Sequence, residues 1–344
     1  MKRQADIRGL DLIEKEAHSQ MMKHLILAIL LLFSFNAFAR EWFSYNVPFA
    51  RCADSQRYKV FVSPGKEPKK VAIEFMGGGA CWSAETCWGP KLVTWIHPIP
   101  KVPAYSYLTT SNSPLKDHTI IYLPYCTGDV WMGNHSADYG NGKLTHHEGE
   151  NNFSSALFYL KQFHYFKNIE ELVVFGSSAG AIGALVNMER LNELAPSAKK
   201  IMIADSPGLH WNENFWHKFT DLQLFDYARR LKSIGLDLDP NNGLMAPQIS
   251  NYCERYSDWK IGFIQSTEDI IMANIFGHMT AMEHRLNVLG PQGLKYNLIN
   301  SNNCSVHTPD GRGHAFLLLK QYSNLQSDMF TKQGLLEYVK ELLD

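Results

Sequence analysis

Short runs of consecutive apolar residues, rich in β-branched and aromatic side chains, recur along the chain between residues 58 and 300. Most of them lack the polar alternation of a half-exposed strand and are typical of strands buried on both faces of a sheet. They predict β-strands at 58–64, 70–76, 118–125, 171–176, 200–206, 260–266 and 295–300.

Segments with the apolar spacing of a helix lie between several of these strands. FSSALFYLKQF at 153–163 precedes the strand expected at 171–176, and AIGALVNMERLNEL at 181–194 follows it. Strands that alternate with helices predict an α/β fold, with a mostly parallel central sheet flanked by helices. We expect residues 40–344 to form one such domain.

Residues 207–257 form the least regular stretch and are rich in Trp, Asn and Phe. Segments inserted between strands of an α/β sheet often cover the crevice at the carboxyl ends of the strands, where ligands bind. This stretch therefore fits a lid or substrate wall. An additional packed subdomain fits the pattern equally well.

The N-terminal region has the layout of a secretory signal. Lys23 precedes an apolar run at 25–33, which is short for a membrane span, and small residues follow up to Ala39. We expect cleavage after Ala39, a secreted or periplasmic product and no membrane anchor after cleavage. Residues 1–20 are then an upstream extension, as a start codon placed too early would give. The alternatives are a buried apolar helix or an uncleaved anchor.

Composition adds few constraints on partners. The formal net charge is −1, from 33 basic and 34 acidic residues, and no long run of one sign occurs, so nothing indicates nucleic-acid binding. The chain has 6 cysteines, all beyond Ala39, and an even number in an exported protein predicts disulfides. No Cys-x-x-Cys motif indicates a zinc ribbon or a redox site. The pair His146-His147 lacks metalloprotease spacing and is interpreted as a surface or loop feature. We expect no metal and no organic cofactor.

The stretch VVFGSSAGAIGA at 173–184 carries the clearest chemical motif. Gly176-x-Ser178-x-Gly180 at a junction from strand to helix is the pattern of a nucleophile elbow, in which a sharp turn exposes the serine hydroxyl. Small residues at such a junction can also serve tight helix–sheet packing alone. We interpret Ser178 as the nucleophile and expect Ser177 to point back into the protein.

A serine nucleophile needs a general base that is oriented by a carboxylate, and on this type of sheet the chain order is serine, acid, histidine. Asp205 and Asp269 each follow a predicted strand, and Asp269 is preferred because it lies further from the serine. His307 and His314 both follow the last predicted strand. His307 is preferred because a disulfide at Cys304 would hold it in place.

A glycine run after the strand at 70–76 is suited to binding an oxyanion. Lipases and esterases carry a similar loop, whose backbone N–H groups face the tetrahedral intermediate. We expect donors from Gly78, Gly79 and Ala80, together with the N–H of Ala179. A phosphate-binding loop is the alternative, but neither of the usual glycine-rich nucleotide motifs is present here.

Taken in order, the stretches GGGACW, PYCTGD, GSSAGAIG, ADSPG and NSNNCSVH resemble the pectin acetylesterase family, which includes the Notum carboxylesterases. The resemblance runs from about Cys52 to His307. It implies an α/β-hydrolase fold, a carboxylester substrate and a triad of Ser178, Asp269 and His307. It also implies disulfides that pair Cys52 with Cys126, Cys81 with Cys87, and Cys253 with Cys304.

These features together predict a serine carboxylesterase that removes acetyl or other short acyl groups from an acylated small molecule or glycan through an acyl-enzyme. A lipase or a polyester depolymerase on the same fold is an alternative. A catalytically silent binding module is another. The sequence gives no indication of an oligomeric state.

Overall fold

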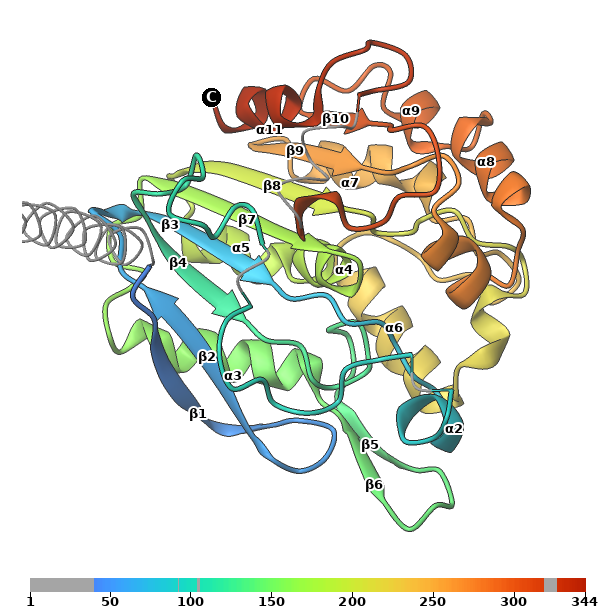
Figure 1. Cartoon of the computed structure of the whole chain (residues 1–344), viewed down its shortest axis with the longest axis horizontal. Coiled ribbons are helices and arrows are strands. Elements are labelled where there is room, and N and C mark those ends of the chain that lie inside the picture. Colours follow the sequence, from blue (N-terminus) through green and yellow to red (C-terminus); the bar gives the residue numbers. More distant parts are fainter. Residues whose placement is uncertain (1–39, 92, 104–105, 319–326) are drawn as a thin grey trace, which may run out of the picture.

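The computed structural model of the chain describes residues 40–91, 93–103, 106–318 and 327–344. An eight-stranded sheet forms its centre, with the strand order β1-β2-β4-β3-β7-β8-β9-β10 (Figure 1). The predicted secretory signal and its cleavage position lie outside the described residues. Within the described part of the chain, none of the helices combines the length and the apolar character needed to cross a bilayer.

The sheet is antiparallel at one edge and parallel elsewhere. β1 pairs with β2 and β2 with β4 in antiparallel register, whereas all pairs from β4 through β3 to β10 are parallel. A separate hairpin joins β5 to β6. The strands are β1 (Phe43–Arg51), β2 (Arg57–Ser63), β3 (Glu67–Phe75), β4 (His118–Leu123), β5 (His135–Asp138), β6 (Leu144–His147), β7 (Glu171–Ser177), β8 (Lys199–Asp205), β9 (Trp259–Ile264) and β10 (Cys304–His307).

Helices cover both faces of this sheet, and the expectation of a mostly parallel sheet flanked by helices is confirmed. Apolar side chains of α3, α4, α5 and α7 join the larger core on one face, and α11 packs on the other face. The helical elements are α2 (Ala84–Cys87), α3 (Gly149–Lys161), α4 (Ala179–Val186), α5 (Met188–Leu194), η1 (Phe215–Lys218), α6 (Asp221–Ser233), η2 (Ala246–Gln248), α7 (Ile249–Arg255), η3 (Ile271–Phe276), α8 (Ala281–Leu289), α9 (Leu294–Asn297), η4 (Phe316–Leu318) and α11 (Leu335–Leu343).

The strand predicted at 295–300 is wrong, because this segment begins as the short helix α9. Leu294 and Leu298 are buried four residues apart, whereas Tyr296 and Ile299 are exposed, so the burial follows a helical period rather than an alternating one. The last strand is β10, which begins only at Cys304. His307 therefore lies in the last strand and not beyond it.

The predicted insertion lies between β8 and β9 and contributes η1, α6, η2 and α7. Figure 1 shows α6 beside α2, and the Gln223 side chain of α6 donates a hydrogen bond to the Cys81 carbonyl at 2.7 Å. The insertion is thereby attached to the segment that directly follows the glycine run.

Three disulfides join distant and local parts of the chain. They pair Cys52 with Cys126, Cys81 with Cys87, and Cys253 with Cys304, as the family resemblance implied. The last of these bridges fastens the start of β10 to α7. It therefore anchors the strand that contains His307 and precedes His314.

Candidate active site

Ser178 lies at the sharp turn between β7 and α4. Its φ of 58° and ψ of −126° are strained for a residue with a side chain, and its N–H donates to the Asp205 carbonyl at 2.8 Å. A Cβ at Gly180 would come within 2.0 Å of the Phe75 carbonyl oxygen, and one at Gly176 within 2.3 Å of the Gly180 carbonyl oxygen. The two glycines allow the close packing that holds this turn.

Ser177 and Asp205 stabilise the turn through buried hydrogen bonds. The Ser177 hydroxyl donates to Asp205 Oδ2 at 2.8 Å, and the Leu317 N–H donates to the same oxygen at 2.8 Å. Burial raises the pKa of Asp205, and these hydrogen bonds oppose the rise. Ser177 thus points back into the protein as expected, and Asp205 is engaged in holding the turn.

Asp269 and His314 form a hydrogen-bonded pair at 2.8 Å, between Oδ2 and Nδ1. The carboxylate of Asp269 is fully buried, and its Oδ1 accepts a hydrogen bond from the Met272 N–H at 3.0 Å. A donor at Nδ1 fixes the tautomer of the imidazole and leaves Nε2 as the acceptor. His314 lines the same cavity as Ser178.

The structure does not bring His307 to Asp269, and the preference for His307 over His314 is corrected on this geometry. His307 is paired with Ile264 in the register of β10 and β9, and its ring stacks on Tyr338 of α11 with 5.2 Å between ring centroids. The strand and α11 hold it within the core. His314 follows seven residues later, in the loop beyond the strand.

The glycine run lies directly against the serine turn. A Cβ at Gly77 would come within 3.3 Å of the Ser178 Cβ. The carbonyl of Gly78 accepts a hydrogen bond from the Trp95 N–H at 2.8 Å, and the Gly79 carbonyl accepts one from the Tyr125 hydroxyl at 3.0 Å. These hydrogen bonds hold the loop in place through its carbonyl groups.

Two cavities meet at Ser178. The first is narrow, at ≈ 60 Å³, and almost wholly apolar. It runs along α4 and is closed on the other side by the insertion. Residues that line it include Gly79, Ala80, Ala179, Ile182, Trp211 and Phe215.

The second cavity is wider, at ≈ 490 Å³, and contains more polar surface. Residues that line it include Glu74, Gly78, Trp95, Ser178, His314 and Leu318. All four residues expected to donate to an oxyanion therefore border one or both cavities beside Ser178. Glu74 could not be identified from the sequence, because a single acidic residue in an otherwise apolar strand matches no catalytic motif.

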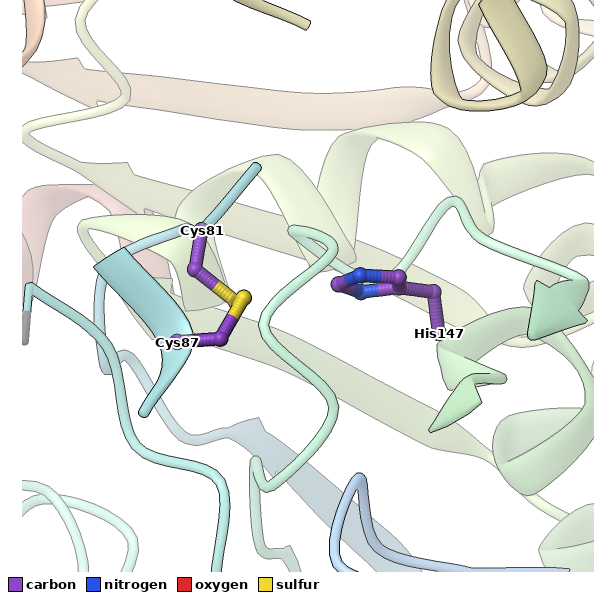
Figure 2. A group of neighbouring side chains, drawn as sticks. All are labelled: Cys81, Cys87 and His147. Atoms are coloured by element: carbon purple, nitrogen blue, oxygen red, sulfur yellow. A yellow bond between two sulfur atoms is a disulfide. The ribbon is translucent and has the colours of Figure 1, made fainter. Parts of the chain in front are cut away.

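Cys81, Cys87 and His147 form the one cluster within the described residues whose ligand atoms are close enough to hold a metal (Figure 2). The two cysteines form a disulfide and offer no thiolate. Nδ1 of His147 donates to the Thr127 carbonyl and Nε2 accepts from the Tyr139 hydroxyl, both at 2.8 Å. Burial lowers the pKa of His147 to about 3. The cluster is thus a packing element in the oxidised protein.

The interpretation of the His146-His147 pair as a surface or loop feature is wrong. Both residues belong to β6 and both are buried. Their side chains are hydrogen-bonded to neighbouring elements, His146 to Ser55 and Ser136, and His147 to Tyr139. Two adjacent histidines do not form an alternation of polar and apolar residues, so the sequence pattern did not indicate that they are buried.

Comparison with known proteins gives two matches. The sequence model of a family described as Pectinacetylesterase matches residues 44–234, which is more than half of the chain. A curated relative, palmitoleoyl-protein carboxylesterase NOTUM of Schmidtea mediterranea, is 36% identical over 80 residues. That alignment covers 23% of this chain and 15% of the relative's own length.

Proposed function

The chain belongs to the pectinacetylesterase family and is a carboxylic ester hydrolase with an α/β-hydrolase fold, and we propose that its catalytic triad is Ser178, His314 and Asp269. The observation that carries the proposal is the 2.8 Å contact between His314 and a fully buried carboxylate, at the wall of a cavity that Ser178 also lines. Each of the three residues follows a different parallel strand, β7, β9 or β10.

In the proposed reaction the Ser178 hydroxyl attacks the ester carbonyl while His314 Nε2 accepts its proton. The tetrahedral intermediate collapses, the bond to the alcohol oxygen breaks, and His314 returns the proton to the leaving alkoxide. Water then attacks the acyl-enzyme with the same base. Asp269 accepts the Nδ1 hydrogen bond throughout and stabilises the imidazolium that forms in each half of the reaction.

The oxyanion of the intermediate would be bound by backbone N–H groups of Gly78, Gly79, Ala80 and Ala179. The glycine run lies against Ser178 on one side, and the start of α4 lies on the other. The N-terminus of a helix favours negative charge. Loss of one such donor costs about 3 kcal/mol of transition-state stabilisation.

The narrow apolar cavity is the proposed site of the acyl group. It follows α4 from Ala179 to Val186, which is about 10 Å at the rise of an α-helix. The lining residues thus extend past the space that an acetyl group would fill, and we propose an acyl group longer than acetyl, whose length the small volume of ≈ 60 Å³ limits. The printed name of the curated relative, palmitoleoyl-protein carboxylesterase, refers to an acyl group longer than acetyl and supports the same direction. The insertion at 207–257 supplies the outer wall.

The disulfides and the N-terminal pattern support export. We propose that the protein is secreted or periplasmic, with residues 40–344 as the mature domain after cleavage following Ala39. Disulfides persist in oxidising compartments and are rare in the cytosol.

The test is hydrolysis of p-nitrophenyl esters from acetate to dodecanoate by the oxidised protein and by Ser178→Ala. The variant loses about 10⁶-fold in kcat if Ser178 is the nucleophile. For the wild type, kcat/KM rises from acetate towards octanoate, because burial of each methylene contributes about 0.8 kcal/mol. Undiminished hydrolysis by Ser178→Ala would contradict the nucleophile. A maximum at acetate would contradict an acyl site for groups longer than acetyl.

A further inference from the structure

Glu74 is a buried carboxyl group in the wall of the wider cavity. Its side chain is 3% exposed, and it lines that cavity together with Ser178 and His314. Its Oε2 is buried and makes no hydrogen bond to the described residues. The triad and the oxyanion loop do not use this group.

The surroundings of Glu74 favour the protonated, uncharged form of its carboxyl group. Burial raises its pKa to about 8, and Ser106 is the polar neighbour that opposes the rise. Among the described residues, no lysine or arginine contributes to that pKa. A protonated carboxyl offers one donor and retains an acceptor, and a buried oxygen of that group is costly when it makes no hydrogen bond.

Its position along β3 separates it from the reacting atoms. Glu74 pairs with Phe175 of β7 in parallel register, three residues before Gly77, which lies against Ser178. Three residues of strand span about 10 Å. A substrate that reaches Glu74 from the ester bond must extend into the wider cavity, away from the apolar cavity along α4.

We propose that Glu74 binds a hydroxyl group of the leaving alcohol and thereby selects esters of polyols over esters of simple alcohols. The inference rests on the triad proposed above, and it assigns the wider cavity to the alcohol. A hydroxyl can both donate to and accept from a neutral carboxyl group, so it satisfies the unpartnered oxygen. A cationic alcohol would instead require an ionised carboxylate in an apolar wall, which burial disfavours.

The experiment compares pairs of esters of one fatty acid that differ in the hydroxyl groups of the alcohol. One pair is the glyceryl and the propyl ester. The other is the 6-O-glucosyl and the cyclohexylmethyl ester. For each pair, the ratio of kcat/KM values reports the recognition of hydroxyl groups and cancels effects on the triad. The two pairs distinguish a glycerol from a sugar as the source of the hydroxyl.

The wild type should favour at least one hydroxylated ester by about tenfold or more, since a site that hydrogen-bonds a hydroxyl discriminates against analogues without it. Glu74→Leu should bring that ratio close to one. Glu74→Gln, which keeps a donor and an acceptor in the same shape, should retain most of it. If Glu74→Leu does not fold, the wild-type ratios and their retention in Glu74→Gln decide the question.

Wild-type ratios near one in both pairs would overturn the proposal, and so would ratios unchanged in Glu74→Leu. A choline ester hydrolysed faster than its 3,3-dimethylbutyl counterpart, with that preference lost in Glu74→Gln, would overturn it in favour of a cation site. If neither the wild type nor Ser178→Ala hydrolyses any of these esters, the result would contradict the esterase mechanism instead.

Discussion

Ser178 shows how the site depends on single backbone conformations. Its φ of 58° and ψ of −126° would suit a glycine, yet the proposed reaction needs the hydroxyl. Conformations of this kind cost about 1–3 kcal/mol. The serine turn therefore stores strain that the neighbouring glycines and Asp205 maintain.

Replacement of Ser178 by glycine or alanine should reveal the backbone strain as a difference in stability between two inactive variants. Ser178→Gly and Ser178→Ala should both be inactive, but Ser178→Gly should have the higher free energy of unfolding, by about 1 kcal/mol after the entropy of glycine is counted. Urea unfolding of the two variants measures the difference. Equal stabilities, or a more stable alanine variant, would show that the turn is not strained.

Glu74 predicts a pH dependence of stability. Its pKa of about 8 in the folded protein lies above its ordinary value of 4.5. Between these values the folded protein keeps a proton that the unfolded chain releases, so the free energy of unfolding falls as pH rises. At about 1.4 kcal/mol per pKa unit, the full effect amounts to a few kcal/mol.

Glu74→Gln removes this titration and serves as the reference. Urea unfolding of wild type and variant at about pH 5 and pH 8 should show that the variant gains relative stability at the higher pH. A stability difference that is the same at both pH values would contradict a raised pKa at Glu74.

At the scale of elements, the loops after β9 and β10 are joined by hydrogen bonds that position the proposed acid, Asp269, and the proposed base, His314. The Thr267 N–H donates to the Pro309 carbonyl, and the Thr267 hydroxyl accepts from the Gly311 N–H at 2.9 Å and donates to Asp310 Oδ1 at 2.9 Å. Arg285 of α8 also contacts Asp310, at 2.5 Å. These contacts hold the turn that brings His314 to Asp269.

Thr267→Val should therefore lower kcat by about tenfold or more while KM changes little, because the ester-binding cavities are left intact and the pair is less well oriented. Steady-state kinetics with a p-nitrophenyl ester measures both constants. Ser305→Ala is the matched control, since it removes a hydroxyl that contacts Tyr338 elsewhere on the same segment. Equal losses in the two variants would contradict a specific positioning role for Thr267.

The choice between His307 and His314 shows which candidate residues local sequence patterns can identify and which they cannot. Ser178 and the glycine run were predictable because each belongs to one turn next to a strongly apolar strand. The choice of histidine depended on where the last strand ends, and the apolar residues of 295–300 belong to a helix and a turn. Once β10 is placed at Cys304–His307, His314 is the histidine in the loop beyond the strand.

At the scale of the whole molecule, the parallel strands bring the catalytic candidates together. Near-continuous apolar runs predicted six of the strands, since strands buried on both faces carry that pattern. The edge strand β1 was not predicted, because only Val47 and Ala50 of its residues are buried. The two cavities were also beyond prediction, since their walls come from β3, α4, the insertion and the loop after β10.

The most direct measurement is kcat/KM for a p-nitrophenyl ester with His314→Ala and His307→Phe, the second of which keeps a ring against Tyr338. We expect kcat/KM to fall at least about 10⁴-fold in His314→Ala, which is a large part of the loss expected for Ser178→Ala. Folded His307→Phe should stay within about tenfold of wild type. A collapse of activity in His307→Phe, with activity retained in His314→Ala, would contradict the assignment of His314 as the base.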